Sequence, residues 1–188
     1  MATLASRRRA PARLPAPVDE VNVWRARADR EGQALREVLG RYVDEQPAGI
    51  ELRTGAHGKP ALADPSSPLR FNLSHSGDLA LVAVTQGREV GVDVERIRPR
   101  RNLPGLADRA LDPAAAAAVH AAPPDAQLTA FHEAWARREA IAKCLGTGLG
   151  APLPPSPVAV QPLDAAPGYA AAVAVAGDKV PAMRLLAL

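Results

Sequence analysis

The chain has 188 residues, of which 47% are hydrophobic, 23% are charged and 3% are aromatic. This length and apolar content can supply one large core or two small ones, which excludes a long disordered protein. The 23 Lys and Arg residues against 20 Asp and Glu leave a net charge of +3, which does not favour nucleic-acid binding and suits an acidic partner.

The N-terminal residues 1–17 carry four arginines and no acid. Pro11, Pro15 and Pro17 interrupt regular structure there. This composition is typical of a flexible basic arm, with an organelle transit peptide as the alternative. We divide the rest of the chain into an N-terminal half, residues 18–98, and a C-terminal half, residues 99–188.

The N-terminal half alternates strands with one helix. Apolar and polar residues alternate over residues 20–26, which predicts a strand, and residues 30–43 have the apolar stripe of a helix. Residues 49–64 indicate a strand that runs into a turn containing Pro60. Residues 69–96 then predict a strand, a polar loop at 72–77, and two strands joined near residues 86–88.

The C-terminal half begins with a basic, proline-bearing connector over residues 97–106. A short alanine-rich helix follows within residues 108–125 and is stopped by Pro123 and Pro124. The strongest helix of the chain is predicted over residues 128–146, where Gly146 stands at the position that favours a left-handed terminating residue. A loop over residues 146–157 and two or three short strands complete the chain.

Two carboxylates interrupt the valine-rich strand EVGVDVER. Alternation along a strand places Asp93 and Glu95 on one face and Val90, Val92 and Val94 on the other. Like charges this close repel unless a cation lies between them, and carboxylate oxygens are the ligands that Mg²⁺ prefers. The alternative is a solvent-facing sheet edge, where acidic residues are ordinary.

A third carboxylate lies on the strongest predicted helix. Trp135, Glu139 and Lys143 are spaced i, i+4, i+8 and so share one face. Glu139 and Lys143 also make a standard helical ion pair, worth about 0.3–0.5 kcal/mol when exposed. Because a tryptophan begins this stripe, we expect Glu139 to be partly buried. It would then complete a metal site or act as a base, with Lys143 neutralising phosphate charge.

Two loops offer polar groups to a ligand. Ser74 and His75 are adjacent in NLSHSG, where no nucleophile-elbow pattern supports covalent catalysis, so we interpret them as donors to a phosphate or ribose. Lys59 lies in the GKP turn, which suits either a phosphate anchor or a surface turn. The GTGLG segment that begins at Gly146 lacks P-loop spacing.

The order of these motifs, HGKP, FNLSHSG, GVDVE and W-x-x-R-E-A-x-x-K followed by a glycine-rich loop, closely resembles the Sfp-type 4′-phosphopantetheinyl transferases. The resemblance covers roughly residues 20–178, and residues 58–143 contain the diagnostic motifs. It implies an α+β fold that is a pseudo-dimer of two similar α+β halves, with the active site in the cleft between them.

The resemblance also implies an activity. Such an enzyme transfers the 4′-phosphopantetheine moiety of coenzyme A to a serine of an apo acyl or peptidyl carrier protein and releases 3′,5′-ADP. Carriers of fatty acid, polyketide or nonribosomal peptide biosynthesis are the expected substrates. The metal would be Mg²⁺, with Mn²⁺ as the alternative, and coenzyme A the co-substrate. We expect acidic carrier domains as partners, no nucleic acid, no membrane, and a monomer.

We also expect a cytoplasmic protein. The single cysteine, Cys144, excludes an internal disulfide framework and fits a reducing compartment. No apolar run approaches the about 20 residues of a membrane helix.

Carried over by position, the resemblance assigns roles to individual residues. Glu139 would act as the base, and Lys143 would stabilise the departing ADP oxygen. The implied catalytic residues are Glu139, Lys143 and Asp93, and the implied metal ligands are Asp93, Glu95 and Glu139. The implied coenzyme A contacts are Arg27, Arg36, Gly58, Lys59, Pro60, Ser74, His75, Asp93 and Lys143.

Three departures from the family pattern put activity or carrier choice in question. Arg138 replaces the usual lysine of W-x-x-K-E, Ala115 stands where an acid is usual, and the segment between Trp24 and the first helix is short. A catalytically weakened coenzyme A-binding or carrier-binding protein of the same fold is therefore the alternative hypothesis. A third hypothesis is an unrelated Mg²⁺-dependent phosphohydrolase, which only the carboxylates favour.

Overall fold

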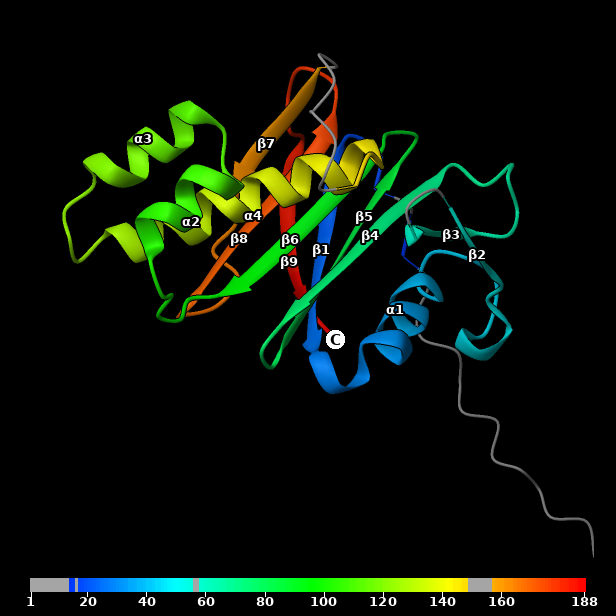
Figure 1. Cartoon of the computed structure of the whole chain (residues 1–188). Helices are drawn as coiled ribbons and strands as arrows, with labels where there is room; N and C mark the ends of the chain where they lie inside the picture. Colours follow the sequence, from blue (N-terminus) through cyan, green and yellow to red (C-terminus); the bar gives the residue numbers. More distant parts are fainter. Residues whose placement is uncertain (1–13, 16, 56–57, 149–156) are drawn as a thin grey trace, which may run out of the picture.

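The computed structural model describes residues 14–15, 17–55, 58–148 and 157–188, which form a mixed α+β fold (Figure 1). One sheet has the order β4 (Leu69–Ser76), β5 (Leu79–Gln86), β1 (Glu20–Arg27), β9 (Ala182–Ala187). A second sheet has the order β6 (Val90–Arg96), β8 (Tyr169–Ala176), β7 (Val158–Pro162). The short strands β2 (Leu52–Thr54) and β3 (Pro60–Leu62) pair separately.

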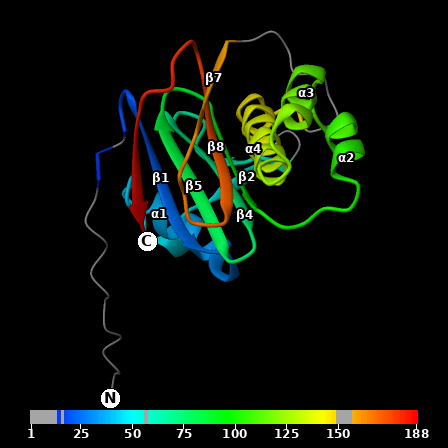
Figure 2. The same ribbon diagram turned by 90° about the vertical axis from the view of Figure 1, so that its left-hand side faces the viewer.

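Helices lie on the outer sides of the two sheets. They are α1 (Glu31–Leu39), α2 (Leu103–Ala110), α3 (Pro113–Ala121) and α4 (Gln127–Leu145), with 3₁₀ turns at Ala28–Arg30 and Pro47–Gly49. Figure 2 shows α2, α3 and α4 gathered on one side of the sheets. Buried residues of α1 pack with β1, β4 and β5 on the other side. Among the described helices, none is long and apolar enough to cross a membrane.

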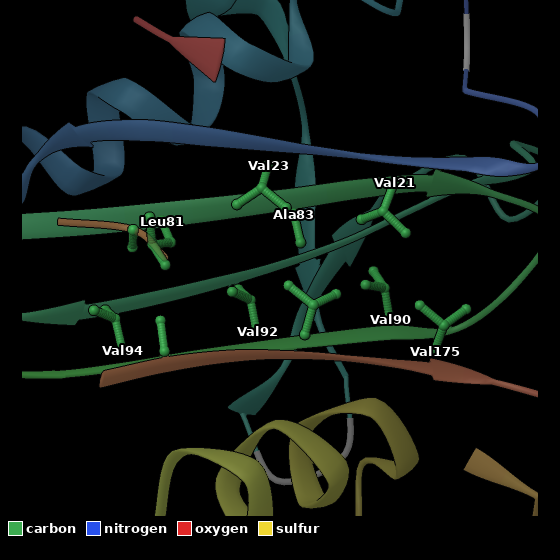
Figure 3. Packing of buried hydrophobic residues seen from close by; sticks show 11 residues of the cluster. Val21, Val23, Leu81, Ala83, Val90, Val92, Val94 and Val175 are labelled. Atoms are coloured by element: carbon green, nitrogen blue, oxygen red, sulfur yellow. The ribbon is translucent and has the colours of Figure 1, made fainter. Parts of the chain in front are cut away.

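The central core lies between the two sheets. Val21 and Val23 from β1 pack with Val90, Val92 and Val94 from β6, and all five side chains are almost completely buried (Figure 3). Val94 retains only 1% exposure, so β6 cannot shift without exposing this cluster to water. The valines therefore anchor the strand whose opposite face carries Asp93.

The joint between the sheets is made by side chains. β4 and β6 are edge strands of different sheets, and no backbone ladder pairs them. Instead, the Val92 N–H donates to Asn72 Oδ1 at 2.9 Å, and the next two alternate N–H groups of β6 donate to Ser74 and Ser76 hydroxyls. These bonds satisfy backbone donors of an edge strand that would otherwise need water.

Helix α4 lies unusually close to β6. A Cβ added to Gly91 would collide with the carbonyl oxygen of Ala140 and the amide nitrogen of Cys144. Small residues on α4, namely Ala136, Ala140 and Cys144, pack against alanines of β8. Because no larger side chain separates helix from strand, α4 can bring its polar face against Asp93.

Most predicted elements are confirmed, including the helix that ends at Gly146, whose φ is 66°. Two predictions are wrong. The expected polar loop at 72–77 is largely strand, because β4 continues to Ser76 with its polar side chains directed at β6. The expected connector at 97–106 contains the start of α2, whose first turn is capped by the Asn102 side chain and includes Pro104.

The strand pairing also links the two predicted halves. Strand β6 precedes residue 99 but pairs with β8, whereas β9 pairs in parallel with β1. The boundary between residues 98 and 99 stays a prediction. The expected basic arm falls mostly on residues 1–13 and the expected glycine-rich and proline-rich loop on residues 149–156, both outside the described ranges.

We expect Gly91→Ala to destabilise the chain by about 2 kcal/mol or more, because the added methyl must force α4 away from β6. Chemical denaturation in urea measures the change. Gly32→Ala is the matched control. Gly32 lies in α1 with no atom within 4 Å of an added Cβ, so alanine should leave the stability unchanged or raise it by about 0.5–1 kcal/mol. Equal midpoints for Gly91→Ala and wild type would contradict the packing argument.

Candidate active site

Asp93 is a buried carboxylate held by two donors from different elements. Its side chain is 3% exposed, and Lys143 Nζ from α4 lies 2.5 Å from Oδ1. The Ser74 hydroxyl from β4 donates to the same oxygen at 2.8 Å. Lys143 Nζ also donates to Ser74 Oγ at 2.9 Å. A charge this deeply buried needs such partners, so the three residues form one network.

The second oxygen of Asp93 is buried and has no hydrogen-bond partner among the described residues. Burial raises the pKa of Asp93, in opposition to the Lys143 and Ser74 contacts, which lower it. An unsatisfied buried carboxylate oxygen is costly to retain. It is therefore a position at which a donor or a cation is favoured.

Glu139 lies one helical turn before Lys143. Its side chain is 12% exposed, and its Oε2 lies 3.9 Å from Lys143 Nζ. Burial and the neighbouring Asp93 carboxylate raise the pKa of Glu139 to about 7, although Lys143 opposes the shift. The sequence prediction of a partly buried glutamate on this helix is thus confirmed. A carboxyl with a pKa near neutrality can take up and release a proton at working pH.

Glu95 lies further along β6 and receives a weaker contact. The Ser76 hydroxyl lies 3.4 Å from Glu95 Oε2, and its oxygen accepts the Arg96 N–H at 3.0 Å. Glu95 raises the pKa values of both Asp93 and Glu139, so the three carboxylates interact electrostatically. Within the described ranges, however, no three His, Cys, Asp or Glu side chains are gathered closely enough to hold a metal ion as they stand.

A cavity of about 360 Å³ opens beside this network. Glu139 and Lys143 of α4 line one part of it, and the GKP turn lines another. The full lining is Gly58, Lys59, Pro60, Asn72, Leu73, Glu139, Ala142, Lys143, Gly146 and Gly148. The cavity thus brings together three motifs that are far apart in the sequence.

Lys59 is held against the end of α4 and the start of β6. Its ammonium donates to Glu89 Oε2 at 2.8 Å, to the Val90 carbonyl at 3.1 Å and to the Cys144 carbonyl at 3.5 Å. Burial raises the pKa of the Cys144 thiol to about 11, so this cysteine is protonated at neutral pH, which is the less nucleophilic form.

The other predicted ligand contacts lie on the α1 side of β4. His75 is exposed and pairs with the Glu31 carboxylate of α1. The Arg36 guanidinium donates to the Ile50 carbonyl, and the exposed Arg27 pairs with Asp29 at 3.2 Å. These side chains are absent from the lining of the cavity beside Glu139, and their predicted contacts with coenzyme A stay predictions.

The helix stripe divides between two surroundings. Trp135 stacks on Phe131 with ring centroids 6.4 Å apart and packs in the cluster formed by α2, α3 and α4. Glu139 and Lys143 face the cavity instead. Ala115 and Arg138, two of the departures from the family pattern, line a separate hollow between α3 and α4.

Sequence reasoning missed three residues that build the site. Asn72 and Ser76 join β4 to β6, and Gly91 sets the approach of α4. The alternation of Leu69, Phe71 and Leu73 with polar residues was the available signal for a continuous strand. It does not reveal which strand those polar side chains contact.

Comparison with known proteins gives one consistent result. The sequence profile of the 4′-phosphopantetheinyl transferase superfamily matches residues 89–179. The 4′-phosphopantetheinyl transferase HetI of Nostoc sp. is 35% identical over an alignment of 161 residues, and the match covers 76% of this chain and 68% of the relative. The 4′-phosphopantetheinyl transferase AcpT of Escherichia coli is 46% identical over 96 residues, 51% of this chain and 49% of the relative.

A third relative is the 4′-phosphopantetheinyl transferase of Bacillus subtilis, which is 34% identical over 120 residues. These residues are 63% of this chain and 51% of the relative. The chain thus spans about two thirds of the Nostoc protein and about half of the other two.

We expect Glu139 to make folding less favourable as the pH rises through about 7. A free glutamate has a pKa of 4.5, so the unfolded chain releases this proton at a lower pH than the folded chain does. The stability contribution is therefore complete below pH 4.5 and is lost as the pH approaches and passes 7. Glu139→Gln, which stays neutral, should be more stable than wild type at pH 8.5 by about 1–3 kcal/mol.

Urea denaturation with a chelator present, at pH 5.5 and pH 8.5, measures this difference. Glu133→Gln is the control, because Glu133 lies on the same helix and is exposed. Parallel pH dependences for wild type and both variants would show that Glu139 does not titrate as the structure indicates.

Proposed function

The chain belongs to the 4′-phosphopantetheinyl transferase superfamily, and from this premise we propose that it transfers the phosphopantetheine moiety of coenzyme A to a serine of an apo carrier protein. The second product is 3′,5′-ADP. The observation that carries the proposal is the pairing of Glu139, which has a pKa near neutrality, with Lys143 at the wall of one cavity. A transfer to a hydroxyl group needs a proton acceptor and a cation of this kind.

The residues divide the reaction between them. The carrier serine oxygen forms a new bond to the pantetheine-linked phosphorus, and the bond from that phosphorus to the ADP oxygen breaks. Glu139 accepts the serine proton, since its carboxylate form is well populated at neutral pH. Lys143 neutralises the charge that develops on the departing oxygen. Asp93 and Ser74 hold the Lys143 ammonium in place.

A divalent cation, proposed as Mg²⁺ with Mn²⁺ as the alternative, fits the donor set at this site. The unpartnered Oδ2 of Asp93 is a hard oxygen donor, and Glu95 and Glu139 interact with Asp93 electrostatically. When bound, the cation supplies charge neutralisation to the pyrophosphate. The three carboxylates would hold it once their side chains come closer together than they lie here.

Several finer features belong to the same proposal. The cavity is lined by residues 58–60 and 72–73 from one predicted half and by residues 139–148 from the other, which supports a cleft between two α+β halves divided near residue 98. The net charge of +3 suits acidic carrier domains. We propose a cytoplasmic monomer, with Gly58, Lys59, Pro60 and His75 as coenzyme A contacts.

The decisive test is incubation of the chain with coenzyme A, Mg²⁺ and several apo carrier domains, followed by intact mass measurement of each carrier. We expect a phosphopantetheine increment on at least one carrier. Glu139→Gln should lower the rate by about 100-fold or more, because a positioned general base contributes on this scale. Glu133→Gln should retain the wild-type rate, since its side chain is exposed on the same helix.

Two other results would reject the proposal. Measurable coenzyme A binding with no increment on any carrier would favour a binding protein of the same fold. Release of phosphate without carrier modification would favour a phosphohydrolase. An unchanged rate in Glu139→Gln would remove Glu139 from the role of base while leaving the transferase activity established.

A further inference from the structure

Two serines of β4 repeat the same arrangement two residues apart. The Ser74 oxygen accepts the Val94 N–H at 3.3 Å while its hydroxyl donates to Asp93 Oδ1 at 2.8 Å. The Ser76 oxygen accepts the Arg96 N–H at 3.0 Å while its hydroxyl donates to Glu95 Oε2 at 3.4 Å. Each serine therefore contacts one carboxylate and the backbone of the residue that follows it.

The hydrogen-bond capacity of a hydroxyl fixes the direction of these contacts. A serine hydroxyl has one proton and two acceptor lone pairs. Ser74 uses its acceptor capacity for the Val94 N–H and the Lys143 ammonium, so its proton is left for Asp93. The Arg96 N–H orients Ser76 in the same sense. Both carboxylates thus receive a hydrogen bond from a donor that the backbone of their own strand holds in place.

Asn72 provides an internal comparison. Its Oδ1 accepts the Val92 N–H at 2.9 Å, so it joins β4 to β6 as the serines do. The residue before Val92 is Gly91, which has no carboxylate to receive a bond. The joining role is therefore shared along β4, whereas the contact with a carboxylate is specific to the two serine positions.

We propose that Ser74 and Ser76 are positioning residues that orient Asp93 and Glu95 for the cation, each by occupying one oxygen of its carboxylate. This inference rests on the proposed function, and it gives Ser74 a role other than direct contact with coenzyme A. Its structural support is strongest at Asp93, where Oδ1 takes both donors and Oδ2 is left buried and unpartnered. By bonding Oδ1, the Ser74 hydroxyl fixes the orientation of the Asp93 carboxylate and therefore the direction of its free Oδ2.

The test measures Mn²⁺ binding to the complex of the full chain with coenzyme A. Electron paramagnetic resonance quantifies the free ion, and the Mn²⁺ bound by coenzyme A alone is subtracted. Loss of a group that orients a metal ligand typically weakens metal binding by about 10–100-fold. Ser74→Ala should weaken Mn²⁺ binding by about tenfold. Ser76→Ala should weaken it less, because the contact of Ser76 with Glu95 is longer. Ser76→Thr retains the hydroxyl and should restore wild-type binding.

Two comparisons separate positioning from general damage. Ser66→Ala removes a serine–aspartate bond of 2.7 Å on an exposed segment, and Mn²⁺ binding should be unchanged. In the transfer assay, the serine variants should need more Mg²⁺ for half-maximal rate, with the KM for the carrier unchanged and the rate at saturating Mg²⁺ largely recovered.

Wild-type Mn²⁺ affinity in folded Ser74→Ala and Ser76→Ala would overturn the inference, as would failure of the wild-type complex to bind Mn²⁺ more strongly than coenzyme A alone. A proportional loss of every kinetic parameter would also overturn it. Absence of carrier modification by the wild-type chain would instead reject the proposed function, because the Mn²⁺ measurement does not depend on turnover.

Discussion

The hydrogen bonds from the β6 backbone to Asn72, Ser74 and Ser76 join two sheets at their edge strands. A backbone hydrogen-bond ladder between β4 and β6 would merge the two sheets into one and remove the face-to-face packing of one sheet on the other. Because side chains act as the acceptors, the edges meet while the valines of β6 still pack against β1 and β5. These bonds determine the geometry of the site, because Asp93 and Glu95 alternate along β6 with the residues whose N–H groups are bonded.

Close helix packing and buried charge depend on each other at this joint. Gly91 allows α4 to approach β6, and the approach brings Lys143 within 2.5 Å of Asp93. Without that ammonium, a carboxylate with 3% exposure would be strongly destabilising. Glu139 lies 3.9 Å from the same ammonium and has a pKa of about 7. Burial at this joint raises the pKa of both carboxylates, so the close packing that holds Lys143 also determines how the acids of the site hold their protons.

The sequence predicted the element types well because its apolar periodicities are strong. The α4 helix and its end at Gly146 follow from local pattern alone, and the Val90, Val92 and Val94 face follows from alternation. The polar residues of β4 were misinterpreted as a loop, because the strand that satisfies them is 20 residues away in sequence. The burial of Asp93 and the ion pair between Lys59 and Glu89 depend on tertiary contacts. The spacing of residues along the sequence does not specify such contacts.

Lys59, which we propose as a coenzyme A contact, also contacts the end of α4. An ammonium has three donors, and Lys59 directs them at Glu89, the Val90 carbonyl and the Cys144 carbonyl. A phosphate that bonds Lys59 must therefore replace one of these acceptors. The Cys144 carbonyl has the longest contact, 3.5 Å, and lies at the end of the helix that carries Glu139 and Lys143. If a phosphate replaced that carbonyl as an acceptor for Lys59, phosphate binding at the GKP turn would release a contact at the end of α4. Phosphate binding would then affect the helix end that lies nearest to Glu139 and Lys143.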